Sequence, residues 1–166
     1  MKLRRQTVAV VLHHTQGSRD STLEELRDLH MRPKHRGGRG WEEIGYHYVI
    51  RHGEVLVGRP ADMEGAHAYS EKVGAGRNHD TIGVAVTGNY LQAFPAEDDM
   101  AAVAKLVDTL RDTWGKLGVL SHREAMASVG DPAHTDCPGS AWVEEIRHRM
   151  DVVGVGADAL YLDQKE

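Results

Sequence analysis

Histidine is abundant in this chain, with 11 histidines among 166 residues, and there is a single cysteine, Cys137. His13 and His14 end an apolar run, and His122 follows a second, shorter one. A thiolate and two imidazoles form a three-ligand set for zinc that leaves a fourth position for water, as hydrolytic sites require. These residue types predict a catalytic zinc site built from one histidine of the first pair, His122 and Cys137.

Only one of His13 and His14 can enter such a site. Residues Thr7–Leu12 are apolar without alternation and rich in β-branched types, which is typical of a strand covered on both faces. Adjacent residues of a strand point to opposite faces, and the residues alone do not choose between the two histidines. They also leave open that these are ordinary buried histidines and a buried thiol, or that Cys137 is a nucleophile paired with His122.

The rest of the pattern predicts a single α/β domain with a mixed central sheet flanked by helices. A first helix is expected from a capping box at Ser21 and Glu24 up to Pro33. A second helix is expected after Pro95, ending near Gly118, and a last one over Ala141–Met150. Further strands are expected at Tyr46–Arg51, Glu54–Val57, Ile82–Thr87 and Val119–Ser121.

Three segments are expected to lie outside these elements. Lys34–Gly40 is a basic, glycine-rich loop that we expect to be exposed. The connection Arg59–Thr81 exceeds twenty residues, and connections of that length in a compact domain are usually functional, so we expect it to line a cleft. The domain should span 1–166, with a core at about 7–150 and a weakly ordered tail at 151–166.

Charge is divided unevenly along the chain. Residues 1–60 carry 11 lysines and arginines against 7 acidic residues, a net +4, whereas residues 61–166 carry 9 against 18, a net −9. A general nucleic-acid binder would show a basic surplus over the whole domain, so we expect no nucleic-acid partner. The Arg36–Gly40 segment could contact RNA, but no interleaved aromatic residues accompany it, which favours a solvated loop.

The composition also bears on the cellular setting. One cysteine excludes an internal disulfide. The apolar run Val8–Leu12 is too short for a signal peptide, and no stretch approaches the roughly 18 apolar residues of a membrane helix. We therefore expect synthesis in the cytoplasm without a signal peptide and no stable membrane association. We also expect a monomer.

Five sequence blocks, in this order, resemble the N-acetylmuramoyl-L-alanine amidase family, the zinc amidases that include phage amidase-type lysozymes and peptidoglycan recognition proteins. The resemblance covers about residues 7–150. The blocks are Val11–Thr15, Gly40–Tyr48, Gly65–Ala68, Asn78–Val84, and Ser121–Arg123 together with Thr135–Gly139. This resemblance implies a domain of the same fold, with zinc at one edge of the sheet, that cuts the amide bond between N-acetylmuramic acid and L-alanine in peptidoglycan.

The resemblance also assigns residues. It implies His13, rather than His14, with His122 and Cys137 as the zinc ligands. Tyr46 matches a tyrosine that reaches the zinc-bound water or the developing oxyanion, and Thr135 matches a polar catalytic residue two positions before the cysteine. On the substrate side the matching residues are His67, which walls the cleft, and Trp41 and Asn78, whose role we expect to be mainly structural.

The chain departs from the family pattern between His122 and Cys137. Fifteen positions separate these two residues, about twice the family spacing, which implies an insertion near Ala125–Pro132 and leaves open whether His134 contributes to the site. Among biological roles the resemblance favours a phage or prophage endolysin, released onto the cell wall after synthesis. The alternatives are a non-catalytic peptidoglycan-binding module and a cytosolic muropeptide-recycling amidase, although the latter usually carries Asp in place of Cys137.

Overall fold

Five strands form one mixed sheet in the computed structural model, which describes residues 1–150; the tail expected at 151–166 lies outside the described residues. The order across the sheet is β3, β2, β6, β1, β7. Strands β2, β6, β1 and β7 run parallel, and β3 pairs antiparallel with β2. Their bounds are β1 Ala9–His14, β2 Tyr48–Arg51, β3 Glu54–Val57, β6 Thr81–Val86 and β7 Gly118–Ser121.

Strand β1 lies inside the sheet, with β6 on one side and β7 on the other, and all six of its residues are buried. Its run of apolar residues without alternation fits this position, because a strand covered on both faces has no polar face. The expected α/β class with a mixed sheet is therefore confirmed, and β1 is the strand that carries the first candidate ligand into the interior.

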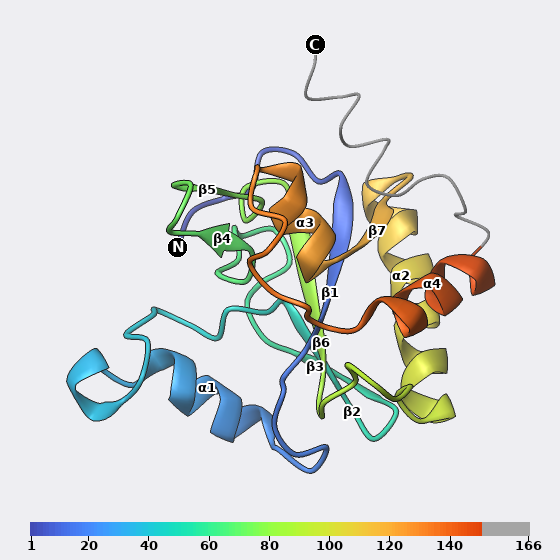
Figure 1. Ribbon diagram of the computed structural model, residues 1–166, viewed down its shortest axis with the longest axis horizontal. Helices are drawn as coiled ribbons and strands as arrows, with labels where there is room; N and C mark the ends of the chain where they lie inside the picture. Colours follow the sequence, from blue (N-terminus) through green and yellow to red (C-terminus); the bar gives the residue numbers. More distant parts are fainter. Residues whose placement is uncertain (151–166) are drawn as a thin grey trace.

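Helices α2 (Glu97–Trp114) and α4 (Ser140–Arg149) cover one face of the sheet, on the right in Figure 1. The strands point Val10, Leu12 and Val84 toward them, and these side chains join the largest hydrophobic cluster. Helix α2 contributes an apolar stripe at helical spacing: Met100, Val103, Leu106, Val107 and Leu110. This layer is packed with apolar side chains, so the chemistry must lie on the opposite face.

The opposite face is covered by shorter elements. Helix α1 (Leu23–Met31) packs Leu26 against Ile44 and Val49, and it projects toward the lower left of Figure 1, followed by the 3-10 turn η1 (Lys34–Arg36). Helix α3 (His122–Ser128) packs Ala125 and Met126 beside β1 and β7. The two-stranded sheet β4 (Tyr69–Ser70) and β5 (Ala75–Gly76) completes this side, which leaves room for a cleft between these elements.

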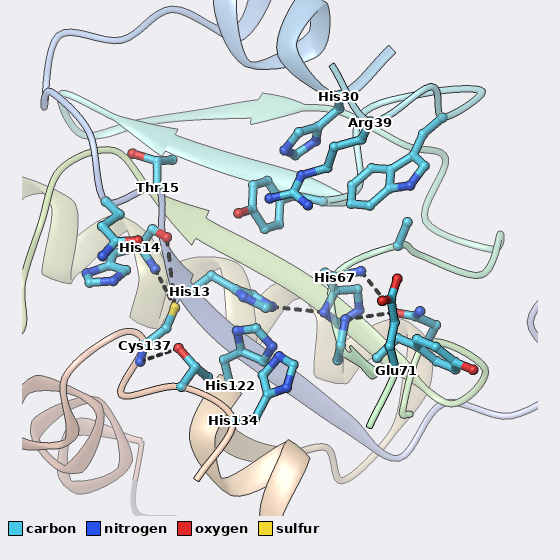
Figure 2. Close-up of a pocket in the computed structure, with 18 of the residues that line it drawn as sticks. His13, His14, Thr15, His30, Arg39, His67, Glu71, His122, His134 and Cys137 are labelled. Atoms are coloured by element: carbon cyan, nitrogen blue, oxygen red, sulfur yellow. Dashed lines mark hydrogen bonds between the residues drawn. The ribbon is translucent and has the colours of Figure 1, made fainter. Parts of the chain in front are cut away.

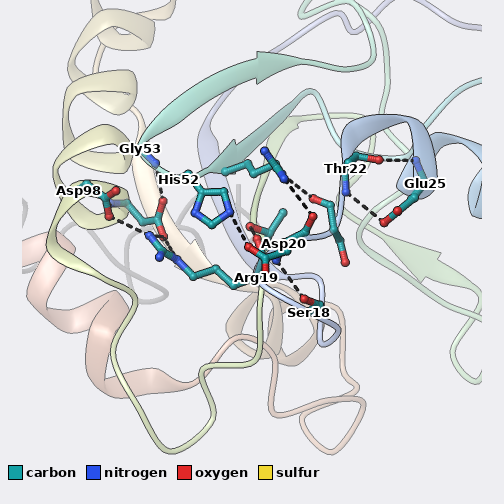
Figure 3. A network of polar contacts seen from close by, with 12 residues as sticks. Ser18, Arg19, Asp20, Thr22, Glu25, His52, Gly53 and Asp98 are labelled. Atoms are coloured by element: carbon teal, nitrogen blue, oxygen red, sulfur yellow. Dashed lines mark hydrogen bonds and ion pairs between the residues drawn. The ribbon is translucent and has the colours of Figure 1, made fainter.

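Helix α1 begins one residue later than the sequence predicted. The N-cap is Thr22, whose hydroxyl accepts from the backbone N–H of Glu25 while the Glu25 carboxylate accepts from the backbone N–H of Thr22 (Figure 3). Ser21 with Glu24 offers the same pattern of residue types one position earlier, so the pattern alone fits two registers. The predicted capping box at Ser21 and Glu24 is therefore wrong, whereas the helix itself is present.

The start of α2 is tied to two distant loops. The Asp99 carboxylate, fully buried, accepts a hydrogen bond from the backbone N–H of Gly53 and forms an ion pair with Arg19, which also pairs with Asp98 (Figure 3). Carboxylates in the first turn of a helix are also favoured by the helix dipole. This network fastens the β2–β3 turn and the segment after β1 to α2, and it lies away from the cleft.

Other boundaries differ from the prediction by a few residues, and four short elements were missed: η1, β4, β5 and α3. Strand β1 extends to His14 instead of ending at Leu12, β2 starts at Tyr48 instead of Tyr46, and α2 ends at Trp114, before Gly115. The long connection contains β4 and β5, and the segment after β7 forms helix α3. Of the helices in residues 1–150, none combines the length and the apolar character needed to cross a membrane.

Candidate metal centre and cleft

His13, His122 and Cys137 come together at the carboxyl ends of β1 and β7. Each offers one ligand atom, and these atoms lie within 4.8 Å of one another; the three residues form the one such group of possible metal ligands found within residues 1–150. They come from the end of β1, the first residue of α3 and the loop before α4, and they point toward one another in Figure 2. His14 points to the other face, where its Nδ1 accepts from the backbone N–H of Tyr90.

The polar atoms of this group fit a metal ion. His122 Nε2 is buried and has no hydrogen-bond partner, and it is the one such side-chain atom among the described residues. A buried polar atom without a partner costs free energy unless another group satisfies it, and a divalent cation would do so here. Two imidazole nitrogens and one sulfur match the donor preferences of zinc.

The environment of Cys137 favours a ligand over a nucleophile. Burial raises the pKa of its thiol to about 12, and a backbone hydrogen bond from His14, 3.4 Å from N to Sγ, acts in the opposite direction. Nucleophilic cysteines need a lowered pKa. Burial also lowers the pKa of His122 to about 4, so this imidazole is neutral and does not stabilise a thiolate as a cation would. Zinc, in contrast, deprotonates a coordinating thiol.

Tyr46 and Thr135 border the three ligand candidates. The half-buried ring of Tyr46 lies with its centroid 5.1 Å from that of His13, and desolvation raises the pKa of its phenol, which stays protonated and able to donate. The Thr135 hydroxyl accepts from the backbone N–H of Cys137 at 3.0 Å, so its own proton is free to be donated. Both residues line the cleft, and both can offer hydrogen bonds to an oxyanion formed there.

The cleft has a volume of about 750 Å³ and holds the metal candidates at one end. The predicted substrate-side residues His67, Trp41 and Asn78 all line it. Asn78 Oδ1 accepts from the backbone N–H groups of His67 and Ala68, which fixes the loop that carries His67. The ring of Trp41 packs against His30, so Asn78 and Trp41 both support neighbouring cleft residues.

The structure adds two cleft residues that the sequence did not single out, and it places His134 in the same cleft. His30 on α1 and Arg39 line one side, and the Arg39 guanidinium lies 5.3 Å from the centroid of the Trp41 ring. His134 lines the other side, next to the His122 ring, and its Nδ1 contacts the buried carboxylate of Asp131. No local pattern marks Arg39, and His134 was left open because it follows the insertion.

Burial keeps the histidines around the site neutral. Desolvation is the main cause of the lowered pKa at His13 and His67, well below the usual range, and at His30 and His47, to about 4. His47 is completely buried: its Nδ1 accepts from the backbone N–H of Gly83, and its Nε2 lies 2.7 Å from the carbonyl oxygen of Met63. One ring nitrogen of His47 therefore accepts a hydrogen bond and the other donates one, which requires the neutral imidazole.

We therefore expect the metal-free protein to lose stability as the pH falls from about 6.5 to 4. In this window the unfolded chain binds a proton at His47 and the folded chain does not, which lowers the free energy of unfolding by roughly 2–3 kcal/mol from this residue alone. Urea unfolding at pH 7 and pH 4 measures the difference, and His47→Gln should reduce it. An equal pH dependence in the variant would contradict this assignment.

Fold and site together define a class of protein: an α/β domain whose three candidate metal ligands open into a cleft at the carboxyl ends of parallel strands. Comparison with known families makes the assignment specific. The family model described as N-acetylmuramoyl-L-alanine amidase matches residues 3–140, and the chain belongs to that family. The resemblance seen in the sequence blocks is thereby confirmed.

Relatives carry the same name or that of the recognition proteins. A human protein named N-acetylmuramoyl-L-alanine amidase is 35% identical over 118 residues, 70% of this chain and 19% of that protein. Peptidoglycan-recognition protein LB of Drosophila melanogaster is 29% identical over 150 residues, 82% of this chain and 56% of that protein. The chain thus spans only about a fifth of the mammalian amidases that it matches.

Solved structures share the fold over almost the whole chain. The amidase LysC from Clostridium intestinale URNW superposes with a TM-score of 0.70 at 26% identity, covering 87% of this chain and 85% of that one. The Ph2119 endolysin from the Thermus scotoductus MAT2119 bacteriophage gives a TM-score of 0.69 at 26% identity, covering 90% and 88%. Amidases, an endolysin and recognition proteins therefore share this architecture.

Proposed function

We propose that this protein hydrolyses the amide bond between N-acetylmuramic acid and L-alanine in peptidoglycan, with zinc as cofactor. The observation that carries the proposal is the convergence of His13, His122 and Cys137, with ligand atoms within 4.8 Å of one another, at the end of a cleft large enough for part of a muropeptide. Membership in the amidase family supports this choice of substrate.

His13, His122 and Cys137 would hold the zinc ion. When bound, zinc supplies hydroxide at neutral pH and Lewis acidity at the carbonyl oxygen. The neutral imidazoles of both histidines can donate lone pairs without first losing a proton, and the backbone N–H of His14 stabilises negative charge on the Cys137 sulfur.

The remaining task of the site is to stabilise the oxyanion that forms when the amide carbonyl is attacked. Tyr46 and Thr135 are the donors that this chain offers for it, since each lines the cleft with a protonated hydroxyl. Donors fixed in advance are effective here because no reorganisation is needed as charge develops. Tyr46 acts as a phenol throughout, because its pKa is raised.

We place this activity in the lysis of bacterial cells by a phage or prophage. Endolysins of this fold, such as that of phage Ph2119, are the structural precedent. The enzyme would be made in the host cytoplasm and would reach the wall after release. Added to living cells, it should lyse only those whose envelope has been permeabilised or whose wall is exposed, which turbidity measurements can follow.

Digestion of purified peptidoglycan tests the proposed reaction. An amidase frees the amino group of L-alanine, which becomes the new amino terminus of the stem peptide, whereas a glycosidase releases reducing sugars. We expect labelling of the digest to find N-terminal L-alanine and mass spectrometry to find intact stem peptides separated from glycan. Binding to the wall without new amino termini would instead assign the chain to the non-catalytic recognition proteins.

A further inference from the structure

The ring of His67 lies in a slot formed by two glycines. A Cβ atom added at Gly83 would lie 2.6 Å from Cγ of His67, and one added at Gly65 would lie 2.4 Å from its Cδ2. These separations are too short for any other residue, so the two glycines let the backbone come close to the ring at two points. With its backbone N–H bound to Asn78, His67 is held at both main chain and ring.

Both ring nitrogens of His67 have partners inside the protein. Nδ1 lies 2.9 Å from Nε2 of His13, and Nε2 lies 3.3 Å from the hydroxyl oxygen of Thr81, whose backbone also hydrogen-bonds the ring (Figure 2 shows the contact with His13). Thr81 is fully buried, does not line the cleft, and is 2.6 Å from the carbonyl oxygen of Arg77. The sequence placed His67 among substrate contacts, but both of its polar atoms face protein groups.

These contacts fix the positions of the protons. A carbonyl oxygen only accepts, so the Thr81 hydroxyl donates to Arg77 and its oxygen is left to accept from Nε2–H of His67. A neutral imidazole has one N–H, so Nδ1 of His67 is an acceptor and the proton between the two rings belongs to Nε2 of His13. The lone pair of His13 is therefore on Nδ1.

We propose that Thr81 and His67 are positioning residues that present His13 to the metal through Nδ1. The carbonyl of Arg77, the Thr81 hydroxyl and the His67 ring form a chain of hydrogen bonds that sets both the tautomer and the orientation of His13. The inference rests on the proposed zinc site and adds to it two residues and a specific ligand atom. Such outer hydrogen bonds typically change metal affinity about 10–100-fold.

Thr81→Val is the test variant, because it removes the hydroxyl at nearly constant volume from a residue that cannot touch substrate. We expect its zinc dissociation constant, measured by competition with a chromophoric chelator, to rise about 10–100-fold. Thr81→Ser, which restores the hydroxyl, should stay within about threefold of the wild-type protein. At saturating zinc, Thr81→Val should regain most of the wild-type activity with an unchanged KM.

Thr87→Val is the matched control, since Thr87 is also fully buried and donates its hydroxyl to a backbone carbonyl, that of Arg19, but touches none of the three ligands. It should leave zinc affinity unchanged. Equal zinc affinity of Thr81→Val and the wild-type protein would overturn the inference while leaving the amidase proposal intact. If the wild-type protein neither bound zinc nor cut peptidoglycan, both the amidase proposal and this inference would be rejected.

A measurement on the wild-type protein keeps the test independent of variant folding. In the zinc-loaded protein labelled with 15N-histidine, NMR should find the proton of His13 on Nε2, with a coupling or cross-peak to His67, and the metal-bound nitrogen at Nδ1. A proton on Nδ1 of His13, with Nε2 bound to zinc, would show that the hydrogen-bond chain does not determine the tautomer and would overturn the inference.

Discussion

Removing the metal with a chelator will abolish the release of amino termini from peptidoglycan, and adding zinc back will restore it. We expect a loss of at least about 10³-fold, because zinc is assigned both the supply of hydroxide and several kcal/mol of oxyanion stabilisation. The digestion assay measures this directly, with dialysed protein before and after zinc is added. The raised pKa of the buried Cys137 thiol argues against this cysteine as an alternative nucleophile.

A ligand variant provides the control for chelation. Cys137→Ser replaces the sulfur by a weaker zinc ligand while keeping the side chain small, so added zinc should not restore its activity at concentrations that restore the wild-type protein. Circular dichroism would show that the variant is folded. Full activity in stripped wild-type protein, or in Cys137→Ser without zinc, would reject the metal mechanism.

Replacing Tyr46 by Phe should lower kcat by about 10²–10³-fold with little change in bound zinc. The substitution removes one preorganised donor to the oxyanion and leaves the ring that packs near His13, and losses of this size accompany the removal of such a donor. Steady-state kinetics on a soluble muropeptide and a zinc assay on the same sample measure the two quantities.

Tyr48→Phe is the matched control for this prediction. Tyr48 begins strand β2, packs against the cluster under α2 and does not line the cleft. The same loss of a hydroxyl there should change kcat by no more than about twofold. A Tyr46→Phe enzyme with nearly normal kcat would show that Thr135 or other groups carry the oxyanion and that Tyr46 is structural.

The sequence predicted the fold because its strongest signals are local. The buried strand around Val10, the leucine spacing of α1 and the apolar stripe of α2 each follow from a periodicity within one element. Boundaries were less certain, since Ser21 and Thr22 both satisfy a capping pattern. Helix α3 was missed because its seven residues start directly at a strand end, where Ser121 serves both as the last residue of β7 and as the N-cap.

The candidate site was predicted only in part, because its arrangement depends on contacts between distant residues. Because adjacent residues of a strand point to opposite faces, the sequence predicted that the side chains of His13 and His14 would point apart. Helices α2 and α4 cover one face of the sheet, so the histidine on the other face is the one that meets His122. The hydrogen bonds of His67 with His13 and Thr81 span 54 and 14 residues, and the slot needs Gly65 from the loop after β3 and Gly83 from β6. No local pattern encodes such a relation, so the partners of His67 emerged only from the structure.

X-ray absorption spectroscopy of zinc-loaded protein, with the metal content of the same sample, determines whether His13, His122 and Cys137 bind zinc together. We expect one zinc per chain with two imidazole nitrogens, one sulfur and a remaining light ligand, and loss of the sulfur signal in Cys137→Ser. Zinc that is absent after loading, or bound without sulfur, would contradict it.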